Sequence, residues 1–122
     1  MESLIPRGNS TLEAEFAQQL QRTVDWLNSL PLDRLDRPRE DGSIADRTFR
    51  ICQDLIRETE AIEGLPAREL PRLRAHGTGS QLAVVGQEFS EAMTSEGLDR
   101  IDSDLTLMRF ITSFVALRRT GS

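Results

Sequence analysis

The residues best suited to chemistry gather in one segment, which runs from Arg68 to Ser80. It holds three arginines and the only histidine of an acidic chain, followed by two glycines and a serine. The first backbone N–H groups of a helix lack partners, and the helix dipole is positive there, so a helix start in this segment would bind anions. The sequence therefore predicts a site for an anion or small ligand. Its candidate residues are Arg72, Arg74, His76, Gly77, Gly79 and Ser80.

This segment matches no known phosphate-binding motif. A Walker loop needs a lysine, which the chain lacks, and a dinucleotide fingerprint needs a preceding strand, which the pattern does not predict. The alternative is that the segment is a junction between helices with solvated arginines.

Other reactive groups point to no second site. His76 is the only histidine, which rules out a histidine cluster for a metal within one chain, and no residue near it in sequence orients it for a catalytic triad. Cys52 follows the apolar spacing of its helix, which is typical of a thiol packed in a core. The sequence thus predicts no catalytic residue, no cofactor and no metal.

Composition limits the classes of partner. The chain has 122 residues and a net charge of −5, which argues against a general nucleic-acid surface. No apolar run approaches the roughly 18 residues of a membrane span. The lone cysteine and the lack of an export signal favour a reducing, cytoplasmic location.

Helical periodicity dominates the chain and predicts an all-α fold, an antiparallel four-helix bundle. The organisation expected is a flexible N-terminal tail over residues 1–10, one bundle domain over 11–119 and a C-terminal tail over 120–122. Apolar residues at three- and four-residue spacing predict helices over 11–30, 44–62 and 98–119. The third helix has two alternatives, because Gly77 and Gly79 weaken it: one kinked helix over 68–94, or a helix that starts near Ser80.

Local signals fix several helix ends. Ser10 with Glu13 forms a capping-box pattern before the first helix, and Ser43 suits the start of the second. Gly64 is placed to end the second helix in the left-handed conformation. Residues 31–42 are expected to form a charged loop, attached to the end of the bundle by its leucines.

The last helix has more apolar surface than three neighbours need. Its apolar residues form one stripe, and a second set of apolar residues widens that stripe. The stripe is Ile101, Leu105, Met108, Thr112 and Val115, and the second set is Leu107, Phe110, Ile111, Phe114 and Leu117. The excess is expected to face a partner subunit or the loop over 31–42.

Three stretches resemble the DinB-like helical bundles: Asp25 to Pro31, Leu35 to Pro38 with Gly42 to Arg47, and His76 with Gln81 to Val84. The resemblance spans roughly residues 12–90 and implies an up-down-down-up topology, often in a dimer. Family members include metal-dependent thiol transferases and isomerases. Their metal site uses three histidines, but the matching positions here hold Arg50 and Thr78, and only His76 remains. The resemblance thus supports the fold and argues against metal chemistry.

Two functions remain. The first is a non-enzymatic helical bundle that acts by association, as a homodimer or with a protein partner, through the apolar surface of its last helix. The alternative is a DinB-like transferase that binds an anion or a thiol cofactor around Arg68–Ser80.

Overall fold

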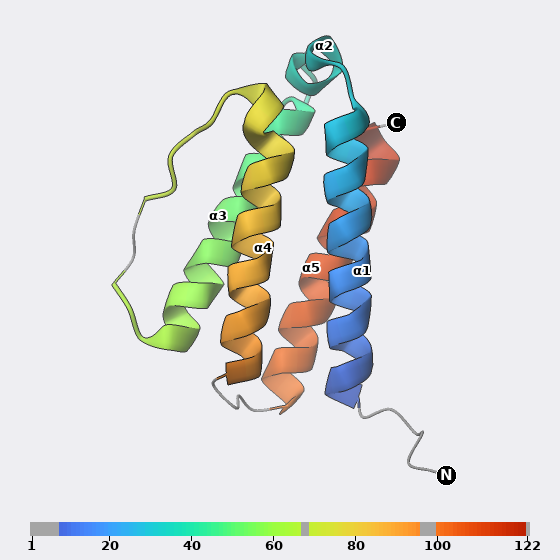
Figure 1. Ribbon diagram of the computed structural model, residues 1–122. Coiled ribbons are helices and arrows are strands. Elements are labelled where there is room, and N and C mark those ends of the chain that lie inside the picture. The colour runs from blue at the N-terminus through green and yellow to red at the C-terminus, as the bar shows by residue number, and fades with distance from the viewer. Residues whose placement is uncertain (1–7, 67–68, 96–99, 122) are drawn as a thin grey trace.

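All regular structure in the described part of the chain is helical. The computed structural model describes residues 8–66, 69–95 and 100–121 (Figure 1). Its helices are α1 (Gly8–Ser29), α2 (Leu32–Asp36), α3 (Ile44–Glu63), α4 (Thr78–Ser95) and α5 (Arg100–Gly121), with a 3-10 turn, η1, at Ala75–Gly77. The predicted all-α class is confirmed.

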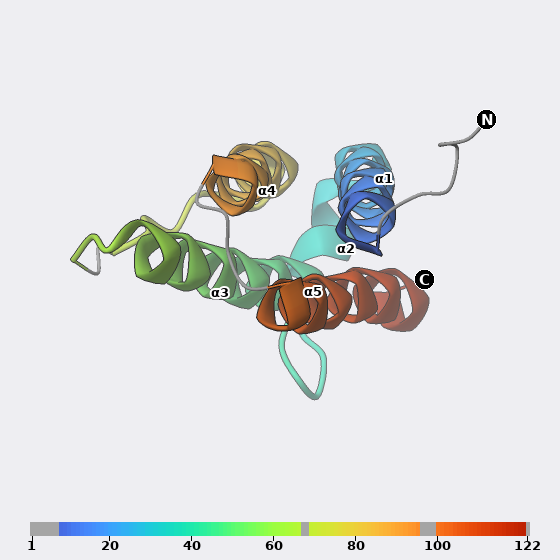
Figure 2. The ribbon, with the colours of Figure 1, turned by 90° about the horizontal axis from the view of Figure 1, so that it is seen from below.

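The four long helices form a bundle of two layers. Figure 2 shows α1 and α4 in one layer and α3 and α5 in the other. In Figure 1, α1 and α5 run upward and α3 and α4 run downward, and α2 lies at the upper end. Neighbours within a layer therefore run in opposite directions, whereas α1 beside α5 and α3 beside α4 run in the same direction.

The ends of α3 follow the local signals closely. The Ser43 hydroxyl accepts a 3.0 Å hydrogen bond from the Asp46 N–H, and the Asp46 carboxylate accepts a 3.1 Å bond from the Ser43 N–H. This reciprocal capping box satisfies two backbone donors that the helix itself leaves unpaired. At the other end, Gly64 has φ of 70° and its N–H donates to the Glu60 carbonyl. Both predictions for α3 are confirmed.

The start of α1 differs from the expectation. The helix begins at Gly8, inside the predicted tail, while residues 1–7 lie outside the described residues. Ser10 is therefore already within the helix, so the predicted capping box of Ser10 and Glu13 does not lie at its start. Helical periodicity marks the face of a helix well but its first turn poorly, because the first turn makes few tertiary contacts.

The segment 31–42, expected to be a loop, contains the short helix α2. Leu35 of α2 is buried, as expected, but Leu32 is exposed. The arginines of this region are not simply solvated. Arg34 donates to the Gly121 carbonyl at 2.6 Å, and Arg39 donates to the Thr120 carbonyl at 2.9 Å.

These two arginines explain why α5 extends past its predicted end. The last carbonyls of a helix have no partner within the helix and carry the negative end of its dipole. Arg47 of α3 adds a 2.6 Å hydrogen bond to the Thr120 hydroxyl. Thr120 and Gly121, assigned to a tail by the sequence analysis, are therefore part of α5.

The third predicted helix takes the shorter of its two forms. Residues 71–74 are not helical, and α4 begins at Thr78 directly after η1. The Gln81 side chain donates to the Pro71 carbonyl at 2.8 Å and holds the non-helical segment against the first turn of α4. The core face predicted for this helix is confirmed: Leu82, Val85, Phe89 and Met93 are all buried.

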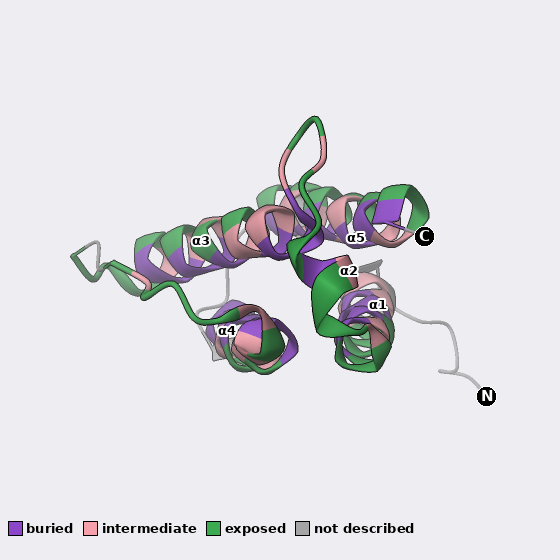
Figure 3. Ribbon diagram, turned by 90° about the horizontal axis from the view of Figure 1, so that it is seen from above, coloured by how far each residue is buried: buried purple, intermediate pink, exposed green. Residues whose placement is uncertain are grey.

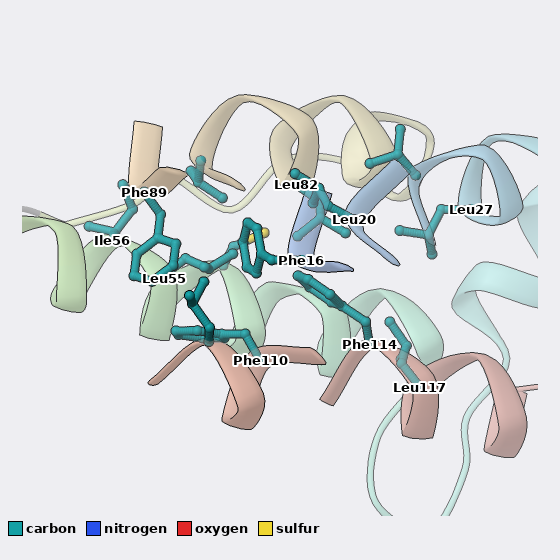
Figure 4. Close-up of a cluster of buried hydrophobic side chains, with 14 of the residues drawn as sticks. Phe16, Leu20, Leu27, Leu55, Ile56, Leu82, Phe89, Phe110, Phe114 and Leu117 are labelled. Carbon is teal, nitrogen blue, oxygen red and sulfur yellow. The ribbon is translucent and has the colours of Figure 1, made fainter. Parts of the chain in front are cut away.

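Four phenylalanine rings form the centre of the core (Figure 4). The Phe16 ring of α1 lies 5.3 Å from that of Phe89 in α4 and 5.5 Å from that of Phe114 in α5, measured between centroids. Phe89 and Phe110 are 5.1 Å apart in an edge-on arrangement. Cys52 of α3 is also fully buried, and burial raises the pKa of its thiol to about 12, so the prediction of a core cysteine is confirmed.

The phenylalanines decide which part of the apolar surface of α5 faces the core. The buried side carries Leu107, Phe110, Phe114 and Leu117, which belong to the set that widens the stripe. The stripe itself points away from the core: the exposed fractions are 62% for Leu105 and 52% for Met108. The larger aromatic side chains fill the interior, because they bury more apolar surface.

Replacing Phe16 by Ala tests this centre. The change removes a ring that contacts two other helices, so we expect the free energy of unfolding to fall by about 3–5 kcal/mol. Urea unfolding followed by circular dichroism measures it. Phe16→Leu, which retains most of the volume, serves as the control and is expected to cost less than half as much. Equal losses would contradict a packed aromatic centre at this position.

Candidate functional site

The predicted anion-binding residues lie along one end of the bundle, from the segment before η1 into α4. Arg72 and Arg74 precede η1, His76 and Gly77 are within it, and Gly79 and Ser80 are in the first turn of α4. Arg68 falls outside the described residues. Arg74, His76 and Ser80 are exposed. The described contacts do not join these side chains to one another.

Arg72 is engaged by α3. Its guanidinium donates a short hydrogen bond to the Asp46 carboxylate and lies over the Phe49 ring, 5.0 Å from the centroid. The hydrogen bond from Arg72 lowers the pKa of Asp46 below its ordinary value, and the Ser43 N–H adds to the effect. Arg72 thereby attaches the segment before α4 to the capping box of α3, a contact that no local signal in the sequence predicts.

Packing explains Gly79, and backbone hydrogen bonds occupy the N–H groups of Gly77 and Thr78. A Cβ on Gly79 would lie 2.2 Å from the Asn28 side-chain oxygen, so a glycine lets α4 approach the end of α1 closely. The N–H of Gly77 donates to the Arg74 carbonyl at 2.8 Å, and the N–H of Thr78 donates to the Ala75 carbonyl. These two N–H groups are therefore not available to a ligand.

An anion at this site would have to compete with contacts that already exist. It would displace Asp46 from Arg72, or bind only the exposed Arg74 and His76. The site therefore stays a prediction. Among the residues described, no group of three or more histidine, cysteine, aspartate or glutamate side chains is placed to hold a metal ion.

A second candidate surface lies on α5, on the side opposite the phenylalanines. We call Leu105, Met108, Thr112 and Val115 the outer face of α5. The first three are exposed and Val115 is intermediate. In Figures 2 and 3, none of the described helices covers the far side of the layer that α3 and α5 form. Ile101 belongs to the same stripe in sequence, but its side chain lies outside those described.

Polar contacts on the other sides of α5 keep its outer face turned away from the bundle. Arg118 donates to the Thr23 hydroxyl and to the Gln19 side-chain oxygen of α1, both at 2.6 Å. Arg109 pairs with Glu58 of α3 at 2.8 Å, and its guanidinium lies over the Phe110 ring. These polar contacts and the aromatic core fix which side of α5 faces outward.

Another apolar surface surrounds Val84 of α4, which is 59% exposed. A groove of about 350 Å³ lies on one side of it, between α4 and the segment that includes Leu70 and Leu73. A second groove of about 450 Å³ lies on the other side, towards Leu20 and Val24 of α1. The sequence does not reveal this surface, because Val84 lies next to the core residue Val85 in a continuous apolar run.

No described helix has the combination of length and apolar character that a membrane span requires. No protein-family model, curated protein or solved structure matches the chain.

The contact between Arg72 and Asp46 predicts a dependence of stability on pH. Because the pKa of Asp46 is lowered in the folded state, its contribution is present above the unfolded pKa, near 3.8, and is lost as the pH falls through the folded value. We expect Asp46→Asn to lower the free energy of unfolding by about 0.5–1 kcal/mol at neutral pH. The change removes one member of a capping box and a half-exposed ion pair, and each of these contributes modestly. The variant's free energy of unfolding, measured by urea titration, should fall less below pH 4 than that of the wild type.

A matched pair of arginine variants tests whether Arg72 is what lowers the pKa of Asp46. NMR titration of the Asp46 carboxyl carbon should show a higher pKa in Arg72→Ala than in the wild type. Arg74→Ala, which removes a nearby arginine with no described contact to Asp46, should leave that pKa almost unchanged. The same shift in both variants would contradict a specific role for Arg72.

Proposed function

We propose that this protein acts by association, as a helical bundle that binds another polypeptide through the outer face of α5. The observation that carries the proposal is the exposure of Leu105 and Met108 in the middle of a helix whose other side is the core. A helix that is apolar on two sides is typical of one buried on both. Full burial of a leucine or methionine side chain contributes about 1.5–3 kcal/mol, which favours a partner on this surface.

The candidate groups for chemistry favour association over catalysis. Arg72 is held by Asp46 and Phe49, Cys52 is sealed in the core, and His76 is exposed with no orienting contact among the described residues. The alternative is a transferase that binds an anion or thiol cofactor at Arg68–Ser80, and in the described part of that segment, residues 69–80, no contact favours it.

We also propose the DinB-like up-down-down-up topology for this bundle. The directions of the four long helices in Figure 1 support it, as does the long connection between α3 and α4. Frequent dimerisation in the family that the sequence resembles agrees with a bundle that acts by association.

Light scattering tests the association directly. We expect a molar mass above that of one chain at tens of micromolar, and we expect Met108→Glu to return it to the monomer value, because a carboxylate would have to be buried in the interface. Val84→Glu is the matched control, since it introduces the same charge at an equally exposed apolar position on α4. Circular dichroism checks that both variants fold.

The pattern of the two variants decides the surface. Loss of association in Met108→Glu alone supports the outer face of α5. Loss in Val84→Glu alone would place the interface on α4. A wild type that remains a monomer at 200 µM and binds no partner would contradict association as the function.

A further inference from the structure

The outer face of α5 has the spacing of a coiled-coil seam. Leu105, Met108, Thr112 and Val115 are separated by three, four and three residues. Alternating steps of three and four are the a and d positions of a heptad repeat, which place side chains along the contact line between two helices. The natural occupant of this surface is therefore another helix.

The seam is symmetric about the level of Phe110. Leu105 and Val115 lie five residues on either side of that level, and Met108 and Thr112 lie two residues on either side. A second copy of α5 in the reverse direction therefore presents the same pattern. It sets Met108 opposite Thr112 and Leu105 opposite Val115, so each layer combines a longer and a shorter side chain.

A parallel arrangement would pair each seam residue with itself. It would place two threonine hydroxyls together in one layer and two methionines in the next. Packing that alternates larger and smaller side chains fills an interface more evenly. The antiparallel arrangement is therefore favoured by shape.

Charge favours the same arrangement. Asp102 and Asp104 lie in the first part of α5, and Arg118 and Arg119 lie in its last turn. Reversed helices bring each acidic end to the basic end of the other copy, whereas parallel helices bring like charges together. The helix dipoles also attract in the reversed arrangement.

The charges at the two ends attract without a direct hydrogen bond between Asp104 and Arg118. Asp104 Oδ1 is buried within its own chain, and Arg118 donates to Gln19 and Thr23 of its own α1. Near the centre, Arg109 of one copy approaches Arg109 of the other, and the two positive charges repel each other. Glu58, which pairs with Arg109 at 2.8 Å in each copy, offsets that repulsion.

From this pattern we infer that the partner of the outer face of α5 is a second copy of this chain, docked with its α5 antiparallel and centred at the level of Phe110. This inference depends on the proposed function, because it names the partner and register for that same surface. A single helix pair of this length buries less than the ~800 Å² per partner of a standard interface, so a dissociation constant in the micromolar range is expected.

Disulfide trapping distinguishes the two directions. Met108→Cys and Thr112→Cys are prepared separately, with different tags, and mixed at 100 µM under mild oxidation. In the antiparallel register, residues 108 and 112 of the two copies face each other, within the roughly 4.4–6.8 Å between Cα atoms that a disulfide needs. Two copies of residue 108 would be offset by about 6 Å along the axis, too far for ready closure. We expect the mixed 108–112 product to exceed either self-linked product at least fivefold.

The wild type is the control for the native thiol. Cys52 is fully buried and its pKa is raised to about 12, so the wild type should form no covalent dimer under the same conditions. Light scattering of each reduced variant accompanies the trapping and reports association independently of the disulfide.

The outcomes separate the two proposals. Predominant 108–112 product supports the antiparallel homodimer. Predominant self-linked 108–108 product, or a dimer by scattering with no disulfide in any mixture, overturns the register while association through α5 stands. A monomer by scattering with no disulfide overturns the homodimer. If the same monomeric protein also binds no partner, the proposed function fails as well.

Discussion

The packing of Phe16, Phe89, Phe110 and Phe114 is the constraint on which the rest of the structure depends. The rings come from α1, α4 and α5, and their contacts determine how far each helix is rotated about its own axis. For α1 and α4 this rotation places the main apolar stripe inside. For α5 it selects one of two apolar stripes and turns the other to the surface. The core therefore determines which residues are offered to a partner.

The two ends of α3 show what the sequence can predict. Ser43 and Gly64 act on backbone groups within a few residues of themselves, so their roles are visible in a short stretch of sequence. Short stretches of sequence do not show which face of α5 is buried. Both of its stripes have helical spacing, and the choice depends on the volume available between helices that are distant in sequence. Side-chain size was the available signal, because the inward stripe holds both phenylalanines.

The arginines show the limit of local prediction most clearly. Arg34, Arg39 and Arg118 make contacts more than 80 residues away in sequence, and Arg72 contacts a helix start that precedes it by 26. Charge runs of this kind normally indicate a solvated surface. Here the guanidinium groups cap the end of α5 and join α1 to α5 and the segment before α4 to α3. A planar group with five donors is well suited to reach carbonyls, hydroxyls and carboxylates at once.

This use of arginine bears on function. A site that binds anions needs positive charge that the fold has left unneutralised, and several arginines instead serve as structural links. Arg118 illustrates the cost: partial burial and the nearby Arg22 lower its pKa, and its hydrogen bonds to Gln19 and Thr23 offset that penalty. The same links hold α5 against α1 and keep its outer face turned outward. Polar contacts that reduce the case for a ligand site therefore strengthen the case for an interaction surface.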